Sequence, residues 1–271
     1  MSSLLHLGMA GVLLVGVAGC TDDPTTPGAG PGCNSPGCIG MGQTAGNGSG
    51  GSGSGGSSGG VADIQGTVRL MADPAFVVTQ SAGWEGTATL VAEPDSGQPI
   101  EQTYTGEKAF LLEDVPEGDG WLIVRDEQGG AGVLSTVTAL EVPHNDPIVA
   151  PIVDLAMLES VADTLVGAPQ LEEGSGHMVV FVARDGDALA EVRVDPGSVP
   201  GAVVAYDNGD SDAYSTDLDS TGELGKILVL NASAPAGGKL VLDVVDGAGN
   251  TYPLDIRVFP NAIAIVGYTL P

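Results

Sequence analysis

Basic residues are scarce in this chain of 271 residues, which has eight Lys and Arg against 35 Asp and Glu and a formal net charge of −27. Residues 1–60 contain Asp22 and Asp23 and no Lys or Arg, so residues 61–271 carry a net charge of −25. Such a surface repels phosphate backbones. Nucleic acid is therefore not expected as a partner, and the acidity is interpreted as keeping an exported protein soluble.

Histidine is also scarce, since the chain has only His6, His144 and His177. His144 and His177 border predicted strands, with no cysteine or paired carboxylate spaced to complete a zinc site. Both are interpreted as surface or edge residues. No arrangement of Ser, His and Asp can be assembled from so few histidines. We therefore predict no catalytic residue and do not expect an enzyme.

Long apolar runs are few, and one of them covers residues 7–18, LGMAGVLLVGVA. This run has the length of the apolar region of a signal peptide and is too short to span a bilayer as a helix. Aromatic residues make up 4% of the chain, whereas Gly numbers 43 and Pro 18. This composition is typical of a turn-rich β protein with a Gly-rich linker.

The stretch Val17-Ala18-Gly19-Cys20 resembles the lipobox of bacterial lipoprotein signal peptides. The resemblance implies that residues 1–19 are a signal peptide and that Cys20 carries the lipid that holds the protein on a membrane. His6 stands in the leading segment where Lys or Arg is usual. Thr21 follows the cysteine, which by the same resemblance favours the outer membrane or cell surface over the inner membrane. Several acyl chains would anchor the protein stably.

Residues 20–60 form a Gly/Ser-rich linker that cannot bury enough apolar area to fold. A flexible coil of this length spans roughly 35 Å. Cys33 and Cys38 flank a turn sequence, Asn34 to Gly37, so a small disulfide loop is expected in an exported chain. Metal binding by this pair would need two more ligands, and no Cys or His lies nearby.

Beyond residue 60 the chain repeats itself at an offset of 116 residues. The matched positions are Thr105-Gly106-Glu107 with Thr221-Gly222-Glu223, Val142 with Val258, and Asn145 with Asn261. We therefore predict two domains, residues 61–155 and 177–271. The connector, residues 156–176, is expected to hold one short helix because its apolar residues from Leu158 to Leu165 fall on one face.

Within each repeat, apolar and polar residues alternate, as in Ile64 to Leu70 and Leu254 to Val258. This period of two is typical of half-buried antiparallel strands. Turn signals such as Asn208-Gly209 and Asp246-Gly247-Ala248-Gly249 separate the apolar segments. The predicted fold class is all-β, with two tandem antiparallel β-sandwiches after the signal peptide and the disordered linker.

The segment TGEKAFLLEDVPEG followed by WLIV resembles the carboxypeptidase regulatory-like, transthyretin-like sandwich. The matched residues are Thr105, Gly106, Phe110, Leu112, Val115, Pro116, Gly118 and Trp121. Repeat two keeps the first three letters but has Asn231 to Pro235 in place of Val-Pro, so an immunoglobulin-like topology stays open. The resemblance implies a non-catalytic spacer or binding module on an exported protein.

Residues 206–223 are rich in carboxylates, the oxygen ligands that calcium prefers. The candidate calcium ligands are Asp207, Asp210, Asp212, Asp217, Asp219 and Glu223. Asp217, Asp219 and Thr221 match the first positions of an EF-hand-like loop, but Leu228 stands where its bidentate Glu is required. Ordinary hairpin turns flanked by solvated acids are the favoured interpretation, and no other cofactor is predicted.

The sequence thus favours a lipid-anchored envelope protein that displays two sandwiches for adhesion, scaffolding or partner binding. The expected partners are the membrane, through the N-terminal lipid, and an envelope or extracellular protein or glycan. The alternative function is a calcium- or carbohydrate-binding surface module. Sugars stack on exposed aromatic rings, for which the candidates are Trp84, Trp121, Tyr104, Tyr206 and Tyr214.

Overall fold

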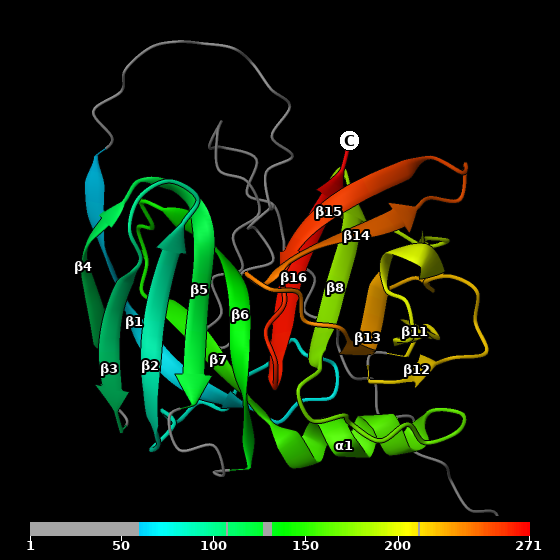
Figure 1. Ribbon diagram of the computed structural model, residues 1–271, viewed down its shortest axis with the longest axis horizontal. Coiled ribbons are helices and arrows are strands. Elements are labelled where there is room, and N and C mark those ends of the chain that lie inside the picture. Colours follow the sequence, from blue (N-terminus) through cyan, green and yellow to red (C-terminus); the bar gives the residue numbers. More distant parts are fainter. Residues whose placement is uncertain (1–59, 107, 127–131, 211) are drawn as a thin grey trace, which may run out of the picture. The chain divides into compact units, whose positions relative to one another are not determined.

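A computed structural model describes residues 60–271 except 107, 127–131 and 211, and this part of the chain is almost wholly β (Figure 1). The all-β fold class is therefore confirmed. The first half contains β1 (Val61–Met71), β2 (Thr87–Pro94), β3 (Ile100–Thr105), β4 (Phe110–Pro116), β5 (Gly118–Asp126), β6 (Val133–Val142) and β7 (Ile148–Asp154). The second half contains β8 (Gly176–Arg184), β9 (Asp187–Ala188), β10 (Arg193–Val194), β11 (Val203–Asp207), β12 (Tyr214–Ser215), β13 (Lys226–Ala232), β14 (Lys239–Val245), β15 (Thr251–Arg257) and β16 (Ala262–Leu270). A 3-10 turn, η1 (Pro196–Ser198), lies between β10 and β11.

The first repeat is a sandwich in which β1 joins two partners. β1 pairs antiparallel with β4 from Val61 to Gly66, and then parallel with β7 from Gly66 to Met71. The facing layer has the order β3-β2-β5-β6. Alternate side chains of both layers enclose an apolar core that includes Ile64, Leu90, Leu112, Leu122 and Ile152. This burial of alternate positions is what the period-two pattern predicts.

The second repeat is organised around β8, which pairs antiparallel with β13 and parallel with β16. Its side chains alternate between two apolar cores. Met178 and Val180 contact the sheet formed by β10, β14 and β15, whereas Val179 and Phe181 contact the core that helix α1 (Leu155–Thr164) covers. The central strand is therefore buried on both faces.

Helix α1 occupies the position predicted for the connector. Leu158, Val161 and Ala162 are its buried residues, which confirms the expected apolar face. The carboxylate of Asp154 caps the first turn by accepting hydrogen bonds from the backbone N–H groups of Ala156 and Met157.

In both repeats the first strand pairs with the last strand and with one further strand at the same offset of 116 residues. β1 with β4 and β7 in the first repeat corresponds to β8 with β13 and β16 in the second, and the β5–β6 hairpin corresponds to β14–β15. The prediction of purely antiparallel sandwiches is corrected by three parallel pairings. β1–β7 and β8–β16 run parallel within the repeats, and β6–β16 runs parallel between them, so the sheets are mixed.

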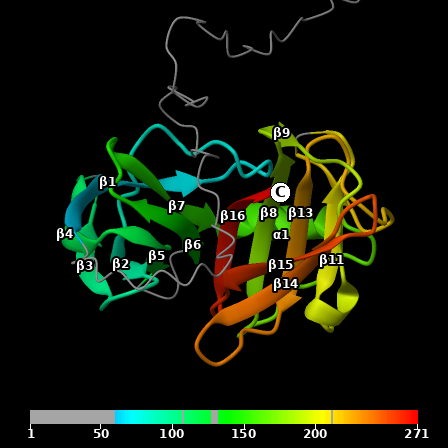
Figure 2. The same ribbon diagram turned by 90° about the horizontal axis from the view of Figure 1, so that it is seen from above.

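The repeats are joined edge to edge rather than by the connector alone. β6 pairs antiparallel with β5 on one side and parallel with β16 on the other, from Ser135–Thr138 to Ala262–Ile265 (Figure 2). One sheet therefore runs from β3 in the first repeat to β12 in the second. We call this β6–β16 pairing the repeat junction.

Candidate functional site

The acidic segment 206–223 separates into one buried and several exposed carboxylates. Asp207, at the end of β11, is fully buried. Its Oδ1 accepts hydrogen bonds from the N–H groups of Gly209 and Leu224, both at 3.2 Å, and its Oδ2 accepts one from Lys226 N at 2.8 Å. This carboxylate therefore ties the turn after β11 to the start of β13.

The remaining predicted calcium ligands point outward. The exposed residues are Asp210, Asp212, Asp217, Asp219 and Glu223. Within the residues that the structure describes, no group of three or more His, Cys, Asp or Glu side chains is placed to hold a metal ion. The Asn208-Gly209 turn lies between the antiparallel strands β11 and β12, as the hairpin interpretation expected. The turn at Ser220-Thr221-Gly222 is not a hairpin, because it joins β12 to β13, and each of these strands pairs with β11. Calcium binding by this segment stays a prediction.

His177 is buried, so its interpretation as a surface or edge residue is wrong. Only 2% of the residue is exposed, because β8 lies inside the sheet between β13 and β16 rather than at its edge. Asn231 N donates a hydrogen bond to His177 Nδ1 at 3.3 Å. Burial lowers the pKa of His177 from 6.5 to about 4, because the charged imidazolium would be desolvated. His144, in contrast, is half-exposed.

Asn231 and Asn261 hold the connector against the second repeat, a role that the sequence did not reveal. Asn231 Oδ1 accepts a hydrogen bond from Glu172 N at 2.9 Å, and Asn231 Nδ2 donates to the Gln170 carbonyl at 2.8 Å. Asn261 Oδ1 accepts one from Gly174 N at 2.8 Å. Both asparagines have positive φ, 60° and 55°, a conformation that Asn tolerates better than most residues. An asparagine directly after or before a predicted strand was therefore the sequence feature that could have indicated these two positions.

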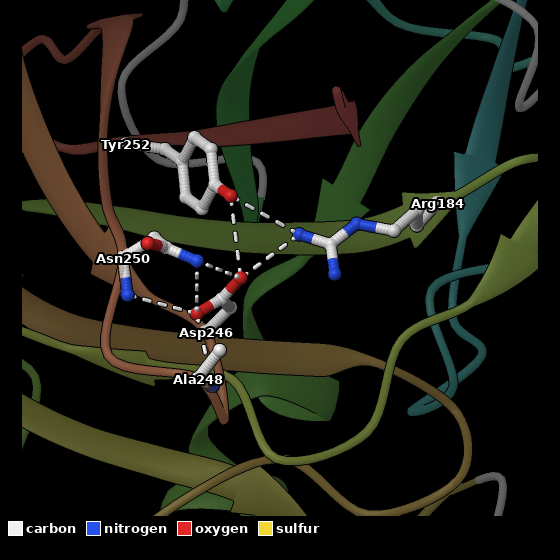
Figure 3. Close-up of polar contacts among 5 residues, drawn as sticks. All are labelled: Arg184, Asp246, Ala248, Asn250 and Tyr252. Atoms are coloured by element: carbon white, nitrogen blue, oxygen red, sulfur yellow. Dashed lines mark hydrogen bonds and ion pairs between the residues drawn. The ribbon is translucent and has the colours of Figure 1, made fainter.

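A side-chain hydrogen-bond network lies at the β14–β15 turn, around Asp246 (Figure 3). Its Oδ1 accepts hydrogen bonds from Ala248 N at 3.0 Å and Asn250 N at 2.9 Å, which fixes the turn. Its Oδ2 accepts from Tyr252 Oη at 3.2 Å and forms an ion pair with Arg184 Nη2 at 2.9 Å. Arg184 ends β8, so the network fastens the covering sheet to the central strand.

The charge state of this network follows from the same contacts. The Arg184 guanidinium, followed by Asn250, holds the pKa of Asp246 well below its usual range. The Asp246 side chain is 3% exposed and that of Arg184 is 32% exposed, so a buried carboxylate meets a half-buried guanidinium. The sequence indicated a turn here, but the pairing with Arg184, 62 residues away, depends on tertiary structure.

The loop between β1 and β2 reaches from the first repeat into the second. Phe76, with a φ of 57°, is buried in the core beneath α1 and makes an edge-on contact with Tyr214, with ring centroids 6.5 Å apart. Lys226 Nζ donates a hydrogen bond to the Ala75 carbonyl at 3.2 Å and lies 5.7 Å from the Phe181 ring. This loop therefore adds a second connection beside the repeat junction.

The aromatic residues considered for sugar stacking are mostly internal. Trp121, Tyr104, Tyr206 and Tyr214 are buried, and Trp84 is half-buried. Tyr104 Oη donates to the Trp84 carbonyl at 3.1 Å, and Tyr206 Oη accepts from Val194 N at 3.0 Å. These four rings therefore pack the fold instead of offering a face to a sugar.

The predicted lipidation site Cys20 and the predicted disulfide partners Cys33 and Cys38 lie outside the described residues. Among the helices of the described ranges, none has the length and apolar character needed to cross a membrane.

No family model and no curated protein sequence matches this chain. The solved structures that are distantly similar to it include the following three. The Bacillus anthracis TIE protein is 10% identical with a TM-score of 0.24, and the match covers 77% of this chain and 34% of that protein. A candidate adhesin from Bacteroides ovatus is 9% identical with a TM-score of 0.24, covering 78% of this chain and 90% of that one. The shaft pilin of Lactobacillus rhamnosus GG, as a D295N mutant, is 10% identical with a TM-score of 0.23, covering 78% and 100%. This chain therefore spans about a third of the TIE protein, and at these TM-scores no function is transferred from these proteins.

Proposed function

We propose that this chain is a non-catalytic envelope protein, anchored by a lipid on Cys20 at the outer membrane or cell surface, which displays its two repeats for adhesion or partner binding. The observation that carries the proposal is the repeat junction. A single sheet continues from the first repeat into the second, so a tether attached at one end would present both repeats together.

The polar interactions of the described residues support the same function. The best-connected carboxylates, Asp207 and Asp246, accept backbone N–H groups and fix turns. Their oxygens are thereby occupied in holding the fold, while many other acids face solvent. A chain whose buried polar groups stabilise turns and whose surface is acidic suits display in an aqueous envelope.

The described part of the chain is paired from its first residues. Glu117 N donates a hydrogen bond to the Gly60 carbonyl at 3.0 Å, and β1 pairs with β4 from Val61 onward. A linker ending at residue 60 would therefore pass directly into a paired strand.

Metabolic labelling with a palmitate analogue tests the anchor. The native chain should be labelled and should fractionate with membranes, whereas Cys20→Ser should lose both properties. Cys33→Ser is the matched control and should keep the label. Added protease should digest the native protein on intact cells if it faces outward. Persistent labelling of the Cys20→Ser variant would contradict lipidation at this residue.

A further inference from the structure

We infer that the chain is a closed array of two repeats, in which two prolines prevent the sheet from continuing into a second copy of this chain. The inference starts from the repeat junction, where a strand of one repeat pairs with a strand of the next. Such a head-to-tail contact can in principle be repeated indefinitely, because each unit offers the same two edges. The structure shows how each outer edge differs from the edges that form the junction.

The first repeat contributes β6 to the junction, and the equivalent strand of the second repeat is β15. In the first repeat, Gly118 lies opposite Val142, and in the second, Val258 N donates a hydrogen bond to the Gly238 carbonyl. Aligning Val142 with Val258 places Pro253 at the position of Val137. Val137 pairs with Ala264 in the junction.

Pro253 removes the hydrogen-bond donor at this position. β15 pairs with β14 alone, so within the described residues no strand pairs with its other edge. Tyr268 Oη, on β16, donates to the Pro253 carbonyl at 3.4 Å. Since the N and C=O of a strand residue project to the same side, this contact places the missing N–H on the open edge. Proline on an edge strand opposes pairing with another chain.

The second repeat contributes the beginning of β16 to the junction. The equivalent residues of the first repeat are 146–149, where β7 begins. The repeat offset that aligns Asn145 with Asn261 places Pro147 at the position of Ile263. Ile263 pairs with Thr136 of β6 on one side and with His177 of β8 on the other. β7 begins only at Ile148, so at Pro147 the first repeat has neither a strand nor an N–H to offer.

The two strands that would form a further junction, β15 and the start of β7, thus each carry a proline. The equivalent positions, Val137 and Ile263, lie one register position apart in the repeat junction. The first repeat can therefore contribute β6 to a junction, but the start of its β7 cannot pair in the way that β16 does. The second repeat can contribute β16, but its β15 cannot pair in the way that β6 does. A terminal unit with a blocked edge is what limits a repeat array to a fixed length. The chain is therefore expected to remain a monomer at high concentration.

Sedimentation velocity over a wide concentration range tests the inference, with Cys20→Ser in every sample so that no lipid is present. The native chain should sediment as a monomer throughout. The double variant Pro147→Thr with Pro253→Thr should associate as concentration rises, with the weight-average mass increasing about two-fold or more. The control, Pro200→Thr with Pro235→Thr, changes two prolines that lie in turns outside the strands and should stay monomeric.

Thermal unfolding of each variant shows whether it is folded. A folded double variant that remains monomeric at all concentrations would overturn the inference, as would a native chain that associates. If the Pro147 and Pro253 variant fails to fold, the two single variants are mixed, because β15 of a Pro253→Thr copy can then pair with the start of β7 of a Pro147→Thr copy. A mixture of folded single variants that stays monomeric would also overturn the inference.

Discussion

The burial of His177 makes the stability of the fold depend on pH in a defined direction. Below its usual pKa of 6.5, a histidine in the unfolded chain binds a proton, whereas folded His177 stays neutral until the pH falls to about 4. The unfolded state therefore binds more protons in this window, and the free energy of unfolding decreases as the pH falls through it. Protonation of Nδ1 would also remove the acceptor for Asn231 N.

The size of the effect follows from the two pKa values. The difference between 6.5 and about 4 corresponds to about 3 kcal/mol at about 1.4 kcal/mol per pKa unit. We expect His177→Gln to abolish this contribution, because Gln has no titrating group and its side-chain oxygen can still accept a hydrogen bond. Between about pH 7 and about pH 4, the free energy of unfolding should therefore fall by about 3 kcal/mol more in the native chain than in the variant.

Urea unfolding at a series of pH values measures this difference. Carboxylates that titrate in the same range contribute equally to both proteins and cancel in the comparison. His144→Gln is the matched control for the loss of a histidine, because the same substitution is then made at a half-exposed position outside the core. Parallel curves for the native chain and His177→Gln would refute the reasoning.

Two further substitutions test the packing and the turn network. A Cβ at Gly66 would lie 2.2 Å from the Ile148 carbonyl oxygen and 2.8 Å from the Phe110 ring, so Gly66→Ala should lower the free energy of unfolding by about 1–3 kcal/mol in urea titrations; an unchanged midpoint would show that β1 is not confined there. Asp246→Asn should lower the melting temperature at neutral pH, because it removes the charge that pairs with Arg184. The lowered pKa of Asp246 means that the native chain should lose this advantage as the pH falls through and below the usual carboxyl range. Melting temperatures that stay equally far apart at all pH values would contradict that assignment.

Local patterns determined the elements of this fold. The alternation in Leu254 to Val258 predicted β15, and the apolar spacing from Leu158 to Leu165 predicted the face of α1. The offset of 116 residues predicted two related units, and the strands of the two halves correspond in pairing. These features depend on neighbouring residues in the sequence, where a period of two or of 3.6 is directly visible.

Tertiary structure alone decided what lies between these elements. The burial of His177 depends on β13 and β16, and the pKa of Asp246 depends on Arg184, 62 residues earlier. The repeat junction joins β6 to β16 across more than 120 residues, and no local pattern specifies which exposed edge a strand will choose. Sequence by itself thus determined which segments form strands, which helix face is apolar and where the chain repeats. Partner choice, burial and charge were decided by the fold, because each is a property of groups that only long-range packing brings together.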